Sequence, residues 1–218
     1  MSLKSTNNDM SKVQFRKICL EKLEHISREK YFRNSHIASK ALNSVLKKLR
    51  FKTILMYLPL KTEVDLRQIF PKLRRNKIIY VPFMECVSFK LVKYRLPVWK
   101  KKFNILEPAD SCGLAQKVDI AVVPVIGVDG DMRRVGFGKG IYDRFFSALK
   151  PKPLVIFIQL AKCFTEKKLC EAYDMQADIY ITPTDIMIKR GKNVFRVRNR
   201  SSCCRNYGSR RICNSKKT

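Results

Sequence analysis

The sequence predicts a layered α/β fold with a mostly parallel central sheet. Short apolar runs of strand length alternate with segments whose apolar residues have helical spacing, as expected when helices connect parallel strands. Prolines follow several of the apolar runs, and a glycine-rich stretch follows the most apolar one. The 218 residues suit one such domain with a tail.

Two helices are expected first. Residues 1–10 are polar and predicted to be disordered, and residues 11–26 have apolar side chains at broadly helical spacing. Ser27 is the expected N-cap of a second helix that runs to about Arg50, because Ser accepts hydrogen bonds from free backbone N–H groups. Glu29 would lie in its first turn, where a negative charge is favourable.

The middle of the chain predicts three strands and a helix. Residues 53–58 form a buried run that ends at Pro59, after which a loop leads into a helix near residues 65–74. The next strand, 77–81, is expected to end at Pro82, and 88–94 alternates like an edge strand. Residues 96–113 are predicted to be irregular.

The second half continues the alternation. Residues 118–125 are the most apolar strand and lead into the glycine-rich stretch. A helix over 139–149, ended by Pro151, is followed by a buried strand over 153–160. The last expected elements are a short helix at 165–172 and a short strand at 178–182.

The net charge of +28 favours anionic partners. Nucleic acids, nucleoside triphosphates and phosphorylated or polyglutamylated metabolites all fit, and charge alone does not choose among them. Residues 189–218 contain eleven basic residues and no acidic one, and are predicted to be a basic, disordered tail. This tail would either bind RNA or membrane phosphates, or remain inert in solvent.

Eight cysteines and two histidines give little support for a structural zinc site, because no two cysteines form a CxxC pair. Reduced thiols are expected instead. No apolar run approaches the roughly 20 residues of a membrane span, and the N-terminus lacks a signal-peptide apolar region. These features predict a cytoplasmic protein without a membrane partner.

Five of the eight glycines lie between Gly127 and Gly140. Glycine allows positive φ angles and close approach of the backbone to a ligand, and the segment Arg134–Arg144 adds positive charge. Backbone N–H groups that lead into a helix N-terminus form an anion site. The spacing matches neither the GxxxxGK[ST] phosphate loop nor the GxGxxG dinucleotide motif. The stretch therefore predicts nucleotide phosphate binding, or else a tight turn with solvated charges.

The longer string is more specific. Pro124–Gly130, a short gap and Arg134–Arg144 resemble the signature of the 5-formyltetrahydrofolate cyclo-ligase family, also called methenyltetrahydrofolate synthetases. That signature is roughly Arg-Leu-Gly-aromatic-Gly-x-Gly-Tyr-Tyr-Asp-Arg after an apolar strand. Ile141 replaces its first Tyr here.

Three further motifs resemble the family in the right order. Lys12 and Arg16 match a Lys-x-x-x-Arg helix, and Tyr57–Asp65 matches an apolar strand followed by an acidic turn. Asp174–Asp178 matches a pair of aspartates four residues apart, with Tyr173 where the family often has His. Four motifs in order make chance similarity an unsatisfactory explanation.

The resemblance spans residues 11–185, so a cyclo-ligase-like domain is expected over 11–188. It implies a three-layer α/β/α sandwich, similar to the ribose-isomerase/CoA-transferase superfamily. A monomer is expected. The resemblance implies Arg134, Lys139 and Tyr142 as catalytic residues, and Asp143 and Asp174 as Mg²⁺ ligands. The implied folate contacts are Leu58, Glu63, Phe137 and Ile141. The implied ATP contacts are Lys12, Arg16, Arg134, Val135, Gly136, Phe137, Gly138, Lys139, Gly140, Ile141 and Tyr142.

The implied reaction converts ATP and 5-formyltetrahydrofolate into 5,10-methenyltetrahydrofolate, ADP and phosphate. Phosphorylating the formyl oxygen makes it a good leaving group, after which N10 attacks the formyl carbon and closes the ring. Such chemistry needs alignment and charge neutralisation rather than a nucleophilic side chain. Two alternatives stay open: a nucleic-acid-binding protein on this fold, and a relative with a changed substrate, for which Ile141 leaves room.

Overall fold

A seven-stranded sheet forms the centre of the computed structural model, which describes residues 10–85, 88–100, 106–108 and 117–189. The strand order is β11-β10-β9-β6-β1-β2-β3. The five inner strands run parallel, and the two edge strands are antiparallel to their neighbours. Its strands are β1 (Thr53–Leu55), β2 (Ile78–Met84), β3 (Phe89–Lys93), β6 (Ile120–Pro124), β9 (Leu154–Ile158), β10 (Ile179–Ile181) and β11 (Ile186–Ile188).

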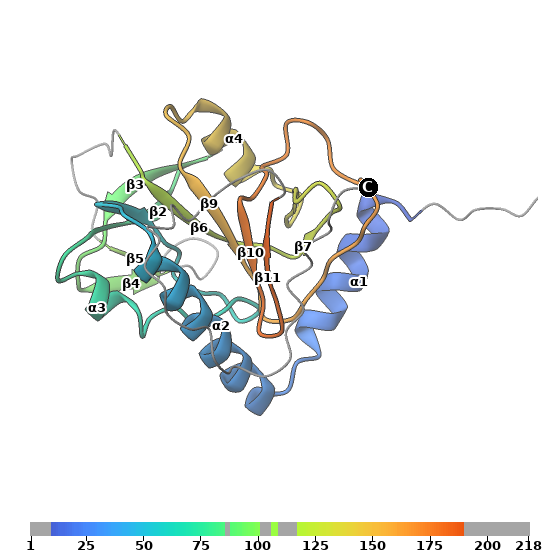
Figure 1. Cartoon of the computed structure of the whole chain (residues 1–218), viewed down its shortest axis with the longest axis horizontal. Coiled ribbons are helices and arrows are strands. Elements are labelled where there is room, and N and C mark those ends of the chain that lie inside the picture. The colour runs from blue at the N-terminus through green and yellow to red at the C-terminus, as the bar shows by residue number, and fades with distance from the viewer. Residues whose placement is uncertain (1–9, 86–87, 101–105, 109–116, 190–218) are drawn as a thin grey trace, which may run out of the picture.

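Helices cover both faces of this sheet, which confirms the three layers. The helix α2 (Arg28–Lys48) packs its buried Leu42 and Val45 with one face of the strands, in a core that also includes Phe70 of α3 (Phe70–Leu73). The helix α4 (Ile141–Ala148) covers the other face (Figure 1). The similarity to the wider superfamily remains a prediction.

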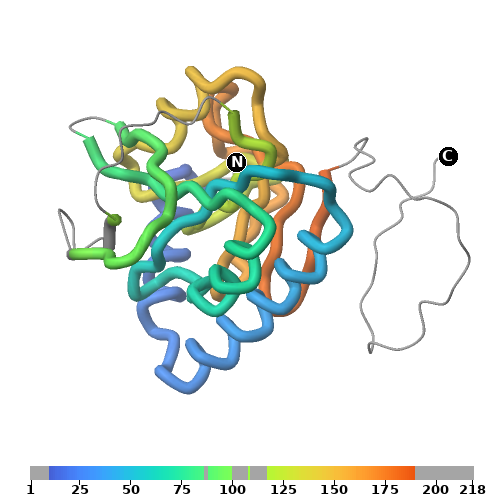
Figure 2. The backbone as a smooth tube through the Cα atoms, turned by 90° about the vertical axis from the view of Figure 1, so that its left-hand side faces the viewer, coloured from blue at the N-terminus to red at the C-terminus, as the bar shows by residue number. Residues whose placement is uncertain are grey.

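The first helix, α1 (Lys12–Glu24), lies to one side of the sheet (Figures 1 and 2). It packs against the short hairpin formed by β7 (Gly127–Val128) and β8 (Arg134–Val135). Its buried residues Phe15 and Cys19 form a third apolar cluster with side chains of this hairpin region. The early part of the chain is thereby fixed beside the glycine-rich stretch.

Several expected elements are shorter than predicted. The first strand ends at Leu55 rather than residue 58, and the helix expected over 65–74 is reduced to α3. Asp65 gives the reason, because its Oδ1 accepts a hydrogen bond from the backbone N–H of Arg67 at 2.9 Å. This local turn competes with helical hydrogen bonding.

Three predictions from the sequence were wrong. The second strand continues through Pro82, which lies beyond the last residue of β1 paired with β2, where its missing N–H costs less. The helix expected at 165–172 does not form, because the N–H groups of Leu169 and Cys170 bind the Asp129 carboxylate instead. The region 96–113 includes a strand pair, β4 (Val98–Lys100) with β5 (Leu106–Pro108).

The ends of the parallel strands decide where a site can form. The segments after β1 and β6 both leave the same edge of the sheet, because the two strands are parallel. Ligands of open α/β sheets bind outside the carboxyl ends of the strands. No helix in the described residues is long and apolar enough to cross a membrane.

Candidate active site

The helix α1 places two cations beside the glycine-rich loop. Ser11 caps it, accepting from the N–H of Gln14, whose side chain binds back to the Ser11 N–H. Lys12 and Arg16 lie four residues apart and therefore on one face. Lys12 Nζ is 2.5 Å from Asp174 Oδ2, and Arg16 Nε donates to the carbonyl of Gly136 at 2.7 Å.

The loop between β8 and α4 has the backbone that its glycines predict. Gly138 has φ 92° and Gly140 has φ 59°, both in the left-handed region. Gly140 is the N-cap of α4 and has no side chain to accept the first N–H groups of that helix. The loop therefore supplies the backbone donors of an anion site.

Arg134 is a buried cation under this loop. Its guanidinium lies 4.8 Å from the Tyr142 ring centroid, and its Nη1 is 3.5 Å from Asp143 Oδ2. A Cβ on Gly136 would come within 2.4 Å of Arg134 Nη2, so only glycine allows the loop to lie this close to the guanidinium. Arg134 Nε is buried without a hydrogen-bond partner, so a donor is still available there.

The two candidate metal ligands lie on segments that contact each other in space. Asp143 Oδ1 accepts from the N–H of Met175 at 3.0 Å, next to Asp174 in the sequence. Asp174 Oδ2 accepts from the N–H of Glu171 at 2.8 Å as well as from Lys12. Each carboxylate therefore already contacts one protein cation and one N–H group. The described residues contain no group of three or more potential metal ligands.

Glu63 lies on the other side of Arg134, in a small cavity with room for about one water molecule. Its Oε2 accepts from the N–H of Leu60 at 2.9 Å. Burial raises the pKa of Glu63 to about 7, and the Leu60 hydrogen bond and the nearby Arg134 charge offset only part of this effect. The cavity is lined by Leu23, Thr62, Glu63, Pro124, Val125, Ile126, Arg134, Gly136 and Phe137.

Most of the residues expected from the sequence come together here. Phe137 is half exposed at the cavity, whereas Tyr142 packs against Phe89 with 5.1 Å between ring centroids. The buried surroundings of Tyr142 raise its pKa, and the Glu63 charge raises it further. Lys139 is exposed in the loop, and its carbonyl accepts from Arg144 Nη2 at 2.7 Å.

Three expected contact residues lie elsewhere. Leu58 and Val135 are buried in apolar clusters, so their backbone groups are what they can offer to a ligand. Ile141 is half-buried and packs with the core that lies under α4. None of these three side chains lines the cavity that contains Glu63.

Two supporting residues were missed by the sequence interpretation. The fully buried Asp129 carboxylate accepts four N–H groups, from Asp131 and Arg133 and from the segment 169–170, at 2.8–3.2 Å. Arg133 Nη1 donates to the carbonyls of Ala172 and Asp174. Together they hold the turn that carries Asp174. The sequence signal for both was their place inside the stretch between Gly127 and Gly140.

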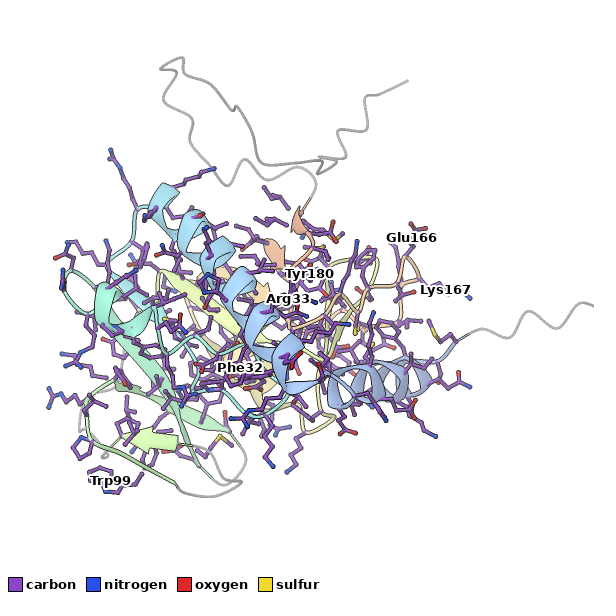
Figure 3. The ribbon with its side chains drawn as sticks, turned by 90° about the horizontal axis from the view of Figure 1, so that it is seen from below. Phe32, Arg33, Trp99, Glu166, Lys167 and Tyr180 are labelled. Carbon is purple, nitrogen blue, oxygen red and sulfur yellow. The ribbon has the colours of Figure 1, made fainter. Side chains whose placement is uncertain are left out.

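The segment after β9 packs against the turn between β7 and β8, which contains Asp129 and Gly130. A Cβ on Gly130 would lie 2.1 Å from the carbonyl oxygen of Glu166, so the two backbones pack in direct contact. Figure 3 shows Glu166 and Lys167 at the periphery of this part of the molecule, with Tyr180 inside it. Trp99, on the β4–β5 pair, lies at the far end of the molecule.

The comparison with protein families agrees with this geometry. The sequence model of the 5-formyltetrahydrofolate cyclo-ligase family matches residues 8–183. The chain belongs to this family. It is therefore grouped with ligases, and all four motif regions lie inside the matched range.

Two curated relatives are 5-formyltetrahydrofolate cyclo-ligases of mycoplasmas. The protein of Mycoplasma pneumoniae is 28% identical over 177 residues, and that of Mycoplasma genitalium is 26% identical over 174 residues. Each alignment covers 79% of this chain and 98% of the relative. The family member described here thus spans nearly the whole length of these relatives.

Solved structures show the same fold. The 5,10-methenyltetrahydrofolate synthetase of Aquifex aeolicus superposes with a TM-score of 0.69 at 27% identity, covering 91% of this chain and 99% of that one. The synthetase of Mycoplasma pneumoniae gives 0.62 at 25% identity, covering 80% and 99%. The comparisons give no support to the alternative interpretation as a nucleic-acid-binding protein.

Proposed function

We propose that this family member is an ATP-dependent 5-formyltetrahydrofolate cyclo-ligase that forms 5,10-methenyltetrahydrofolate, ADP and phosphate. The observation that carries the proposal is the position of Arg134, which lies between the Glu63 cavity and the glycine-rich loop. A cavity with one carboxylate thereby adjoins a loop with cations and backbone N–H donors. This arrangement suits a reaction between an uncharged heterocycle and a triphosphate.

The triphosphate would bind along the loop Gly136–Gly140. Lys12 and Arg16 approach this loop from α1, and Lys139 extends from the loop itself. Positive groups and N–H donors stabilise the charge that spreads over the transferred phosphoryl group. Arg134, Lys139 and Tyr142 are proposed to line the path of that transfer.

The pterin ring of the folate would bind at Glu63. When ionised, a carboxylate accepts two N–H donors side by side, and a pterin presents such a pair from its ring N–H and its amino group. The cavity holds about one water molecule, so ring binding requires the neighbouring loop with Phe137 to move outward. Phe137 would then lie against the bound ring.

The bond changes follow from this placement. The formyl oxygen of the substrate attacks the terminal phosphorus of ATP, and ADP leaves. N10 then attacks the formyl carbon, loses its proton, and expels the oxygen as inorganic phosphate. The protein aligns the two substrates and neutralises charge, so this route needs no covalent intermediate on a side chain.

Asp143 and Asp174 fit Mg²⁺ in chemical type. Magnesium is commonly held by one or two carboxylates together with substrate phosphates, and both side chains are oxygen donors near the loop. When bound, the ion would neutralise phosphate charge. The two carboxylates now contact Lys12 and Arg134, so these cations would exchange partners with the ion and the phosphates.

The direct test is to incubate the full chain with 5-formyltetrahydrofolate, ATP and Mg²⁺ and to follow the methenyl product by its absorbance. Product formation that requires ATP and releases one phosphate per ring closed is expected. Absence of ATP-dependent product near neutral pH, from protein shown to be folded, would disprove the proposal. Product formed without ATP would disprove the phosphorylated intermediate.

A further inference from the structure

A second group of cations lies at the opposite edge of the sheet from the candidate active site. It surrounds an open pocket of about 590 Å³ where β1, β2 and β6 begin, whereas the glycine-rich loop follows the carboxyl end of β6. The pocket is lined by Leu49, Arg50, Phe51, Lys52, Lys77, Lys117 and Asp119. We call this the N-edge pocket.

The charge of the N-edge pocket is strongly unbalanced. Four of its lining residues are basic and one is acidic, which gives a local charge of +3. The acidic residue, Asp119, is hydrogen-bonded to the start of β1. Its Oδ2 accepts from the N–H groups of Lys52 and Thr53 and from the Thr53 hydroxyl at 2.8–3.0 Å. The segments that contribute residues 49–52 and 77 to the pocket, 30–62 and 66–84, contain no aspartate or glutamate.

One of these cations is held in place at the pocket wall. Lys77 Nζ donates to the carbonyl of Phe51 at 2.6 Å and lies 4.5 Å from the centroid of the Phe51 ring. An ammonium has three donors, so Lys77 can keep this bond and still bind a ligand oxygen. The ring and this carbonyl position the charge before any ligand arrives.

We propose that the N-edge pocket binds compounds that carry a diphosphate group. A diphosphate has about three negative charges near neutral pH, which matches the local charge. The pocket volume is within the roughly 300–1,000 Å³ of small-molecule sites. The same chemistry is offered by inorganic pyrophosphate and by a nucleoside diphosphate. This site is separate from the one proposed above, and it does not depend on the cyclo-ligase reaction.

The test is a titration of the full chain with pyrophosphate and, separately, with ADP, followed by amide NMR shifts. Because the glycine-rich loop also attracts phosphates, the readout must resolve the two sites. Shifts at residues 50–53 and 117–119 report the N-edge pocket, and shifts at 136–141 report the loop. The double variant Lys52→Gln/Lys117→Gln should weaken the pocket response at least about tenfold and leave the loop response unchanged.

The double variant Lys17→Gln/Lys30→Gln is the matched control, because it removes the same charge at exposed positions outside the pocket. It should bind as the wild type does. Folate turnover should be the same in all three proteins, since the pocket lies at the other edge of the sheet. A response to pyrophosphate alone would identify the inorganic anion as ligand, and a stronger response to ADP would identify the nucleotide.

Three outcomes would overturn the proposal. The first is that both diphosphates shift only residues 136–141. The second is that the control variant weakens binding as much as the pocket variant, which would show a general charge effect. The third is that a single-stranded oligonucleotide, with an affinity that falls steeply with salt, shifts residues 50–53 while neither diphosphate does.

Discussion

At the scale of single residues, Arg134 connects the two parts of the candidate site. It stacks on Tyr142, contacts Asp143 and lines the cavity of Glu63. The sequence identified these residue types through a motif, but it could not show that Arg134 is buried. Burial matters because a charge in low dielectric acts more strongly on its neighbours than the same charge in water.

The elevated pKa of Glu63 predicts a pH dependence. Since an ionised carboxylate is needed to accept the pterin N–H groups, KM for the folate should fall as the pH rises through about 7. In Glu63→Gln the KM should be higher and should lose this dependence. Initial rates at saturating ATP between pH 5.5 and 8.5 measure it. An unchanged pH profile in the variant would show that another group titrates.

The same pKa shift affects folding with a defined sign. The folded carboxyl keeps its proton up to about pH 7, whereas the unfolded one releases it near its ordinary value of 4.5. The free energy of unfolding should therefore fall as the pH rises from about 4.5 to about 7. Urea titrations of the wild type and Glu63→Gln should show a smaller decrease for the variant.

Lys139 carries a prediction about the phosphoryl transfer. Lys139→Gln should lower kcat/KM by roughly 10²–10³-fold, because the variant lacks the positive charge that stabilises the transferred phosphoryl group. Lys150→Gln removes the same charge from an exposed position after α4 and should stay within roughly twofold of the wild type. Steady-state rates with varied ATP measure both. Equal losses in the two variants would show a non-specific effect of charge.

At the scale of elements, the loop between β8 and α4 brings the backbone N–H groups of a helix start together with a buried cation. The helix supplies N–H groups at its start, and the strand fixes Arg134 under the loop by pairing with β7. Helix α1 reaches the same loop from a distant part of the chain through Arg16. The site therefore depends on the packing of α1 against the hairpin.

Two glycines of this region should respond differently to alanine. Gly138→Ala meets no atom closer than 3.9 Å, but a side chain at a φ of 92° is strained, so it should destabilise the fold by about 1–2 kcal/mol. Relief of this strain would shift the loop, so KM for ATP should rise. Gly130→Ala would place its Cβ 2.1 Å from the Glu166 carbonyl, so it should lower Tm more. Calorimetry and ATP kinetics separate the two effects. A larger fall in Tm for Gly138→Ala would contradict this assignment.

At the scale of the whole molecule, positive charge is arranged in separate places. In the described part of the chain, one group surrounds the glycine-rich loop and a second lines the N-edge pocket. Ten further basic residues belong to 190–218, which lie outside the described residues. The predicted tail and the predicted disorder of the N-terminus thus stay predictions. The monomeric state also stays a prediction.

Truncation after Lys189 tests whether the basic segment takes part in the enzyme. Lys189 itself is retained because its N–H donates to the carbonyl of Asp178 at 2.9 Å. The shortened chain should keep the kcat, KM and Tm of the full chain, since a segment so poor in apolar residues buries little surface. Retention on a polyanion resin should decrease, because ten basic residues are lost. A lower kcat would assign the tail a role in catalysis.

The sequence by itself determined the α/β class, the main parallel strands and the motifs that predict the candidate site. Apolar spacing places β6 and β9 correctly, and the capping residue Ser27 starts α2 as expected, because both signals are local. Motif order identified the family. The limits of α3 and the continuation of β2 through Pro82 were not predictable, since they depend on a side-chain turn at Asp65 and on the length of a neighbouring strand.

Only the tertiary structure decided how these residues act together. Asp129 draws the N–H groups of 169–170 into a turn where helical spacing predicted a helix, and that turn positions Asp174 beside Lys12. The tertiary structure also placed Arg134 beneath the loop and four cations around the N-edge pocket. The reason is that long-range hydrogen bonds and shared burial join segments that are far apart in the sequence, and no local pattern records such contacts.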